Sequence, residues 1–414
     1  MKYFTGDESG LIKWISFPPK IKERRPKKAK KNEGGDEKKE ETPALQPLTG
    51  VFGKVDKTQA VQKLAWATLD DKKLLLVARK NGTIQFMSLE DGSIVKELKN
   101  KHVGTEEKQG CFVGLFVHNN HLCVCTSTGD LSYTPLDAKE TCTVTNLGPN
   151  LEIMRNHPVQ THIFAIGGKD QDLRVYNIEE LLKAKEIEVT DAAGPQKNTS
   201  THKNKSTKNT GLIFQAKNVK NDFLDLQQPV WIHDLQFMNK EATKIAVSTH
   251  YHQFRLYDTK AGRRPVINVE IGKHPIKVLS VGKDFNHVLF ADTMGTVGTI
   301  DIRTGKRAAQ YKGFTGACTA LATAPQPEFE EENNNAKEQF VISTSLDRFL
   351  RIHETSTVYR NIVEKNYLKQ RLTCLLVDQD FVYPLPKSSE EEEDEEDLWE
   401  SMEVVDDRKR KRQG

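Results

Sequence analysis

The sequence predicts an all-β protein, a seven-bladed β-propeller closed by a strand from the C-terminal part of the chain. Three observations predict it. A short apolar strand, a small or polar turn and a second, alternating strand recur seven times along the 414 residues. Where no polar insertion intervenes, the copies are spaced close to the roughly 40–45 residues of a four-stranded blade. A further apolar strand follows the seventh copy, where it can complete an unfinished first blade.

Each copy matches the second and third strands of a WD40-type blade, in which a turn delivers a strand that ends near Trp-Asp. The copies lie at 3–16, 74–88, 122–135, 163–177, 244–258, 287–301 and 340–354. The usual Trp position is held by Ile15, Met87, Thr134, Tyr176, Tyr257, Ile300 and His353. No copy keeps a Trp-Asp pair, so one copy alone predicts little, whereas seven in series indicate a propeller.

Polar insertions account for the three longest spacings between copies. They lie at about 18–47, 183–220 and 325–338. Segments with so few apolar residues cannot offset the entropy of ordering, so we expect mobile loops. The predicted propeller domain spans residues 1–386.

Ring closure is predicted from the two ends of the chain. Only two strands of blade one fit before Pro18, so its inner strand is missing there. The apolar segment 372–377 (LTCLLV) follows the last copy and can supply it. Joining the ends in one blade removes open sheet edges that would invite aggregation.

Composition narrows the class of protein. No apolar run approaches the roughly 18 residues that cross a bilayer, and MKYFTGDESG lacks the apolar stretch of a signal peptide. We therefore expect no membrane and a cytosolic or nuclear location. The six cysteines are scattered without paired CxxC motifs, which argues against a zinc site. Cys123 and Cys125 fall on one face of an apolar strand, so we expect buried thiols.

No catalytic motif is present, and we predict a protein without enzymatic activity or cofactor. The sequence contains no GxxxxGK[ST], HExxH or GxSxG. Gly167 and Gly168 follow a strand but precede another strand, which is not the context of a phosphate cradle. His250 and His252 alternate as metal ligands can, but without a third ligand nearby we favour ordinary histidines of the rim or core.

Two basic clusters are candidates for nuclear import or for contact with RNA. Residues 20–31 (KIKERRPKKAKK) carry eight positive charges against one negative, and a second cluster ends the chain. The members are Arg24, Arg25, Lys27, Lys28, Lys30, Lys31, Arg408, Lys409, Arg410, Lys411 and Arg412. Composition does not separate import from RNA binding, and a solvated linker is the plain alternative.

Cations also recur inside the repeats. Lys13, Arg174, Arg255 and Arg351 occupy one strand position, which either faces neighbouring strands and solvent or forms a ring of phosphate contacts. Arg263 and Arg264 follow Gly262 in a turn between strands. Adjacent arginines in an exposed turn can bind phosphate or carboxylate through their forked donors.

The segment 221–237 (NDFLDLQQPVWIHDLQF) mixes aromatic and aliphatic residues with Asp222 and Asp225. It leads into the predicted inner strand of blade five. Such a segment either packs over the propeller rim, which is the default, or offers anchors such as Trp231 to a partner.

The tail at 387–414 is predicted to be disordered, acidic first and basic last. From residue 388 it carries twelve acidic and five basic side chains, a net charge of −7. Since the whole chain has a net charge of +3, the residues before 388 carry +10. Blocks of like charge often form interaction tails, and Leu398, Trp399, Met402 and Val405 are spaced for a short helix on binding. The basic body favours anionic partners.

Several strings resemble a specific family, the nucleolar WD-repeat ribosome-biogenesis factors of early pre-60S particles (the Nop-seven-associated proteins). They are HYHQFRLYD (250–258) followed by RRPV (263–266), the lead-in NDFLDLQQPVW (221–231), SLDRFLRIH (345–353) and YLKQRLTCLL (367–376). The resemblance spans most of residues 1–377. The insertion at 20–39 and the tail correspond less closely.

The resemblance implies a scaffold without catalytic activity in the nucleus and nucleolus. Such a protein docks on pre-60S particles as a monomer, contacts assembly factors and pre-rRNA, and is released by an AAA-type ATPase, for which the tail is a candidate handle. We predict that partners or RNA bind at Asp222, Asp225, Trp231, Tyr251, His252, Arg263, Arg264 and Arg348.

The alternative is a substrate receptor of a cullin-type ubiquitin ligase. Such propellers usually carry Trp-Asp-x-Arg after a third strand. The nearest match, residues 300–303 (IDIR), lacks the Trp, and the basic body also argues against this function.

Overall fold

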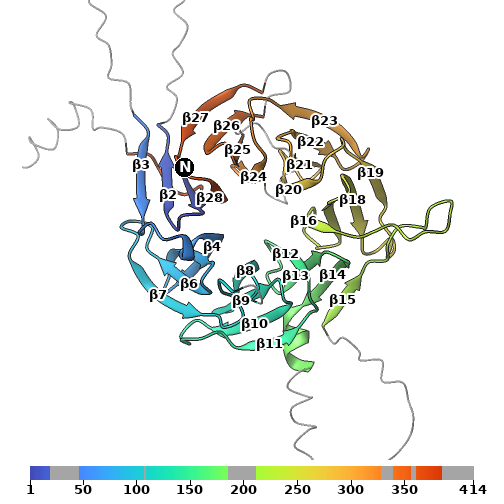
Figure 1. Cartoon of the computed structure of the whole chain (residues 1–414), viewed down its shortest axis with the longest axis horizontal. Helices are drawn as coiled ribbons and strands as arrows, with labels where there is room; N and C mark the ends of the chain where they lie inside the picture. The colour runs from blue at the N-terminus through green and yellow to red at the C-terminus, as the bar shows by residue number, and fades with distance from the viewer. Residues whose placement is uncertain (19–45, 107–108, 185–210, 328–338, 356–359, 385–414) are drawn as a thin grey trace, which may run out of the picture.

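Seven four-stranded antiparallel sheets are arranged as blades around a central channel in the computed structural model (Figure 1). The structure describes residues 1–18, 46–106, 109–184, 211–327, 339–355 and 360–384. The seven blades form a closed ring, since the inner strand of each blade contacts the inner strands of both neighbours. The predicted fold class is confirmed.

Blade one joins the two ends of the described chain. From the channel outward it consists of β28 (Leu372–Asp378), β1 (Lys2–Asp7), β2 (Ile12–Ser16) and β3 (Leu48–Phe52). In Figure 1 the red end of the chain meets the blue end in this sheet. Strand β28 pairs with β1 from Lys2 to Asp7, and the Met1 ammonium donates to the Phe381 carbonyl at 2.8 Å. The predicted closure is therefore confirmed.

The other blades follow the chain in order, each running from its inner to its outer strand. Blade two contains β4 (Val61–Leu69), β5 (Lys72–Arg79), β6 (Thr83–Met87) and β7 (Ile94–Lys99). Blade three contains β8 (Phe112–His118), β9 (His121–Thr126), β10 (Asp130–Pro135) and β11 (Thr143–Asn146). Blade four contains β12 (Leu151–Asn156), β13 (Ile163–Gly168), β14 (Gln171–Asn177) and β15 (Leu212–Gln215).

Blade five contains β16 (Ile232–Phe237), β17 (Lys244–Thr249), β18 (Gln253–Asp258) and β19 (Ile267–Glu270). Blade six contains β20 (Ile276–Val281), β21 (His287–Asp292), β22 (Val297–Asp301) and β23 (Lys306–Tyr311). Blade seven contains β24 (Cys318–Ala324), β25 (Phe340–Ser345), β26 (Phe349–Glu354) and β27 (Ile362–Tyr367). A short 3-10 helix at Lys57–Gln59 and a helical turn at 178–184 are added to the described sheets.

The core consists of seven apolar clusters, one between each pair of adjacent blades. Alternation along each middle strand supplies one face to each neighbour, so both faces of a blade are buried. All seven residues at the usual Trp position are buried. Cys123 and Cys125 are buried free thiols, as expected.

One predicted insertion contains an element of the fold. Strand β15 lies within the interval 183–220, where a mobile loop was expected, so the ordered blade begins earlier than predicted. The apolar residues of LIFQ are sufficient to pair with β14, although only Phe214 is buried. Residues 185–210 of that insertion, most of the other two and the tail at 387–414 lie outside the described residues.

Every inner strand carries a β-bulge near its start. The pairing with the second strand skips one residue in each blade, which pushes an extra side chain toward the channel. The bulged residues are Gln62, Val113, Glu152, His233, Lys277, Thr319 and Thr373.

Candidate partner-binding site

The lead-in segment at 217–231 connects the outer strand of blade four to the inner strand of blade five. Its tip is a compact loop closed by Asp222, whose Oδ1 accepts from the backbone N–H groups of Leu224 and Leu226, both at 2.9 Å. The side chain of Asn221 donates to the carbonyl and carboxylate of Asp225 at 3.0 and 2.8 Å. Asx turns of this kind fix a loop with its own polar groups. The two predicted aspartates therefore shape the loop.

The loop presents apolar side chains to solvent. Phe223 is 94% exposed, Leu224 63% and Leu226 60%. The expectation that these side chains pack on the rim is wrong, because the loop satisfies its own hydrogen bonds and projects away from the blades. It extends outward beside β18, at the right of Figure 1. Clustered, exposed apolar side chains usually mark an interaction surface.

The arginine pair is attached to this same segment. The Nε–H of Arg263 donates to the Gln215 carbonyl at 2.8 Å, and that of Arg264 donates to the Asn218 carbonyl at 3.4 Å. The backbone N–H of Lys217 donates to the Arg263 carbonyl at 2.7 Å. Both arginine residues are exposed, and none of the described residues accepts from their terminal guanidinium nitrogens. Each side chain is thus positioned through Nε with its forked donors available.

A cavity of about 440 Å³ lies between these two segments. It is lined by Asp172, Gln215, Ala216, Lys217, Asn218, Val219, Asn221, Gln227, Arg263 and Arg264. Asp172 Oδ1 is buried there without a hydrogen-bond partner among the described residues. Burial raises the pKa of Asp172, while the nearby guanidinium groups act in the opposite direction. The groove is predominantly cationic and retains one unsatisfied acceptor.

Trp231 is held at the end of the lead-in by a polar chain. Its indole N–H donates to Glu152, whose other oxygen lies 2.5 Å from His233 Nδ1. His233 Nε2 lies 3.1 Å from His250 Nδ1, and the His250 ring stacks on Trp231 with 4.0 Å between centroids. Burial alone would raise the pKa of Glu152, but hydrogen bonds from His233 and Trp231 hold it below the usual range. Burial and the neighbouring His233 lower the pKa of His250.

The two histidines of the turn in blade five have different partners and do not form a metal-binding group with each other. His250 is engaged with Trp231 and His233, whereas His252 lies 3.7 Å from Glu270. Tyr251 packs edge-on against His250 at 5.6 Å. Among the described residues, no group of three or more His, Cys, Asp or Glu side chains is arranged to hold a metal ion.

The structure places five of the predicted contact residues where blade four joins blade five, in two separate groups. Asp222 and Asp225 shape the lead-in loop, and Arg263 and Arg264 line the groove beside it. Trp231 lies at the other end of the lead-in, beside Glu152 and His250. Arg348 belongs to blade seven, where it donates to the Tyr367 hydroxyl at 3.2 Å. The basic clusters at 24–31 and 408–412 lie outside the described residues. Within the described part of the chain, no helix is both long enough and apolar enough to span a membrane.

The cation that recurs in the third strands does not form a phosphate-binding ring. Lys13, Arg255 and Arg351 are 7%, 1% and 1% exposed, so they are buried within their blades. Arg174 is half-buried and donates to the Gln171 side chain and the Tyr176 hydroxyl of its own strand. Sequence reasoning missed Asp172, Lys217 and Asn218, because no motif links residues that meet only when two blades pack together.

Comparisons with known proteins show similarity to relatives that carry one of two names, WD repeat-containing protein 74 or ribosome biogenesis protein NSA1. It is 30% identical to WD repeat-containing protein 74 of Bos taurus, over 86% of this chain and 84% of the relative. The identity to the Homo sapiens protein of that name is 27% over 98% and 90%. Ribosome biogenesis protein nsa1 of Schizosaccharomyces pombe is 26% identical over 98% and 97%. No family model matches the chain.

Solved structures support the fold independently. The WD40 propeller domain of Doa1 superposes with a TM-score of 0.51 at 13% identity, covering 75% of this chain and 83% of that domain. At this identity the likeness concerns the fold alone.

Proposed function

Because this chain belongs to the family of WD repeat-containing protein 74 and ribosome biogenesis protein NSA1, we propose that it is a non-enzymatic assembly factor of the 60S ribosomal subunit. It acts as a scaffold that binds pre-60S particles through assembly factors and pre-rRNA. It works in the nucleolus as a monomer within the particle, and the basic clusters serve nuclear import. An AAA-type ATPase releases it, acting on the tail at 387–414.

The observation that carries this proposal is the lead-in loop. A propeller that only had to fold would gain nothing from exposing Phe223, Leu224 and Leu226, because burying each of these side chains is worth about 1.5–3 kcal/mol. Large apolar side chains of this kind anchor protein interfaces when a partner desolvates them. The arginine pair beside them adds forked donors for the carboxylates or phosphates of a particle.

The test is affinity purification from cell extract, comparing the wild type with a Phe223→Ser/Leu224→Ser variant. We expect the variant to fold normally and to recover several-fold less pre-60S assembly factor and large-subunit precursor RNA, because truncating interface anchors costs about 2 kcal/mol or more. Mass spectrometry and RNA sequencing of the eluate measure both.

The matched control is Val55→Ser/Met294→Ser, which removes side chains that are 70% and 66% exposed on other blades. It should recover the wild-type set of partners. Unchanged recovery by the loop variant would contradict the role of this site. Recovery of cullin adaptors without precursor RNA by the wild type would contradict the function itself.

A further inference from the structure

The central channel contains a cavity of about 860 Å³, whose lining includes neither the lead-in loop nor the arginine pair. Glu152 and His233, which hold Trp231, lie in its wall. It is lined by inner strands of all seven blades, including every bulged residue. This volume lies in the range of cavities that hold small-molecule ligands.

The three carboxylates that line this cavity are each already paired. Glu152 is bound to His233 and Trp231, and Asp380 lies 2.6 Å from Lys73 Nζ. Asp234 accepts from Arg155 Nη2 and from the backbone N–H of Leu279, both at 2.8 Å. No further carboxylate lines the cavity to balance another cation.

Lys63 is a cation of the cavity lining that has no described ion-pair partner. It follows the bulge of β4, and the residues in the same place on the other inner strands are Gly114, Ile153, Asp234, Val278, Ala320 and Cys374. Asp234 is the single carboxylate among these seven equivalent positions, and it is already in an ion pair with Arg155. No described carboxylate lies within ion-pair distance of Lys63. Burial lowers the pKa of Lys63, the charge of Asp234 acts in the opposite direction, and the field of Arg155 adds to the lowering.

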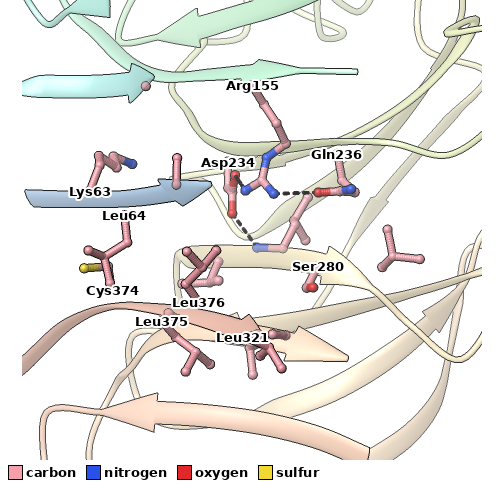
Figure 2. A pocket seen from close by; sticks show the side chains of 18 of the residues that line it. Lys63, Leu64, Arg155, Asp234, Gln236, Ser280, Leu321, Cys374, Leu375 and Leu376 are labelled. Carbon is pink, nitrogen blue, oxygen red and sulfur yellow. Dashed lines mark hydrogen bonds and ion pairs between the residues drawn. The ribbon is translucent and has the colours of Figure 1, made fainter. Parts of the chain in front are cut away.

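Arg155 supplies a second unsatisfied donor. Its terminal nitrogens donate to Gln236 and Asp234 at 2.7 and 2.8 Å, but its Nε is buried without a partner among the described residues. Figure 2 shows Lys63 and the Arg155–Asp234–Gln236 group lining one cavity, with the Lys63 amine directed into it. An ammonium without an ion-pair partner and a guanidinium with one unused N–H donor, both lining the same cavity, favour the binding of an anion.

We infer that the channel binds a small phosphate-bearing ligand, with an oxyanion between Lys63 and Arg155. Lys277 lies at the bulge of β20, without a described ion-pair partner, and adds positive charge to the cavity lining. The ligand offsets the charge of Lys63, which is half-buried and has no described ion-pair partner.

The test is calorimetric titration and thermal unfolding of the full chain with inorganic phosphate and with pyrophosphate, against chloride at equal ionic strength. Phosphate should raise the wild-type Tm, and pyrophosphate should bind more tightly if the ligand carries a longer phosphate chain. Lys63→Met should weaken binding by about tenfold or more, the value of a charge-assisted hydrogen bond. In chloride alone it should unfold at the same or a higher temperature, because a half-buried ammonium without a described ion-pair partner is replaced by an apolar side chain.

Lys80→Met is the matched control, because Lys80 is exposed in the turn between β5 and β6 and does not line the channel. It should respond to phosphate as the wild type does, and Lys63→Arg should retain binding. Lys63→Gln provides a smaller neutral change if the Met variant folds poorly. A wild-type Tm that is insensitive to both anions, or an equal response of wild type and both neutral variants, would overturn the inference.

Discussion

At the scale of single residues, the buried cations of the third strands are paired or hydrogen-bonded by nearby side chains. In blade seven, Arg351 donates to both oxygens of Asp347 in the preceding turn, at 3.0 and 2.5 Å. In blade one, Lys13 lies 3.0 Å from Asp7, at the end of the neighbouring strand β1. Arg255 in blade five uses Gln253, Asn218 and Asn268 instead. A cation in the third strand is therefore a structural feature of these blades, satisfied locally.

The Asp347–Arg351 pair gives a prediction on stability and pH. Burial alone would raise the pKa of Asp347, but hydrogen bonds from Arg351, Ser345 and Thr315 hold it well below the usual range. The ionised carboxylate therefore stabilises the fold above its unfolded pKa, and this contribution is lost as the pH falls toward the folded value. Asp347→Asn should lower the free energy of unfolding at pH 7 by about 3 kcal/mol, because Arg351 loses its counter-ion.

Urea unfolding at pH 7 and in acid measures this difference, which should shrink as the pH falls. The control is Asp301→Asn, which breaks an ion pair with the exposed Arg303 and should cost less than about 1 kcal/mol. Equal losses in both variants, or a loss for Asp347→Asn that does not change with pH, would show that the buried pair is not the cause.

At the scale of elements, the sequence predicted the middle strands well and the outer strands poorly. The second and third strands of all seven blades lie where the repeats place them, since both faces of these strands are buried and their apolar residues are concentrated. Strand β15 lies inside a predicted insertion because an outer strand buries few apolar side chains and so lacks a clear sequence pattern. The bulges were not predictable, because a shift of register changes hydrogen bonding and leaves composition unaltered.

The candidate site shows the same limit. The lead-in segment and the arginine pair stood out in the sequence, but the hydrogen bonds that join them cross between blades. The exposure of Phe223 was not predicted either. An apolar side chain near a strand is usually buried, and only the closure of the loop by Asp222 turns it outward.

Strand β28 gives a prediction at this scale. A chain ending at residue 370 lacks the inner strand of blade one, which leaves the inner edge of β1 unpaired and opens a gap between β24 and β4. We expect residues 1–370 to be insoluble, because two unprotected sheet edges and the cores on both sides are exposed. The soluble fraction and size-exclusion profile measure this, with residues 1–386 as the control. A soluble, monomeric 1–370 chain would contradict closure by β28.

At the scale of the whole molecule, charge is divided between a basic body and an acidic tail. Residues 1–387 carry +10 and the rest −7, so the summed field attracts anions to the propeller while the tail opposes it. Neither sign bears on the fold, which depends on seven apolar clusters shared between blades.

This division predicts how the protein binds RNA. Affinity for single-stranded RNA should fall steeply between about 50 and 200 mM salt, because each neutralised phosphate releases a counterion. Residues 1–386 should bind more tightly than the full chain at low salt, since they lack the acidic tail. Fluorescence anisotropy with labelled RNA measures both effects. An affinity independent of salt would mean that the basic body does not contact phosphate.

The pairing of the first strands with the last has a consequence for biosynthesis. Strands β1 and β2 leave the translating ribosome long before their inner partner β28, which begins at Leu372. At roughly 5–20 residues per second, blade one waits about 20–70 s for that partner. Its unpaired edge is exposed throughout this interval, so the nascent chain is a natural client for a chaperone that shields β-strands until β28 has emerged.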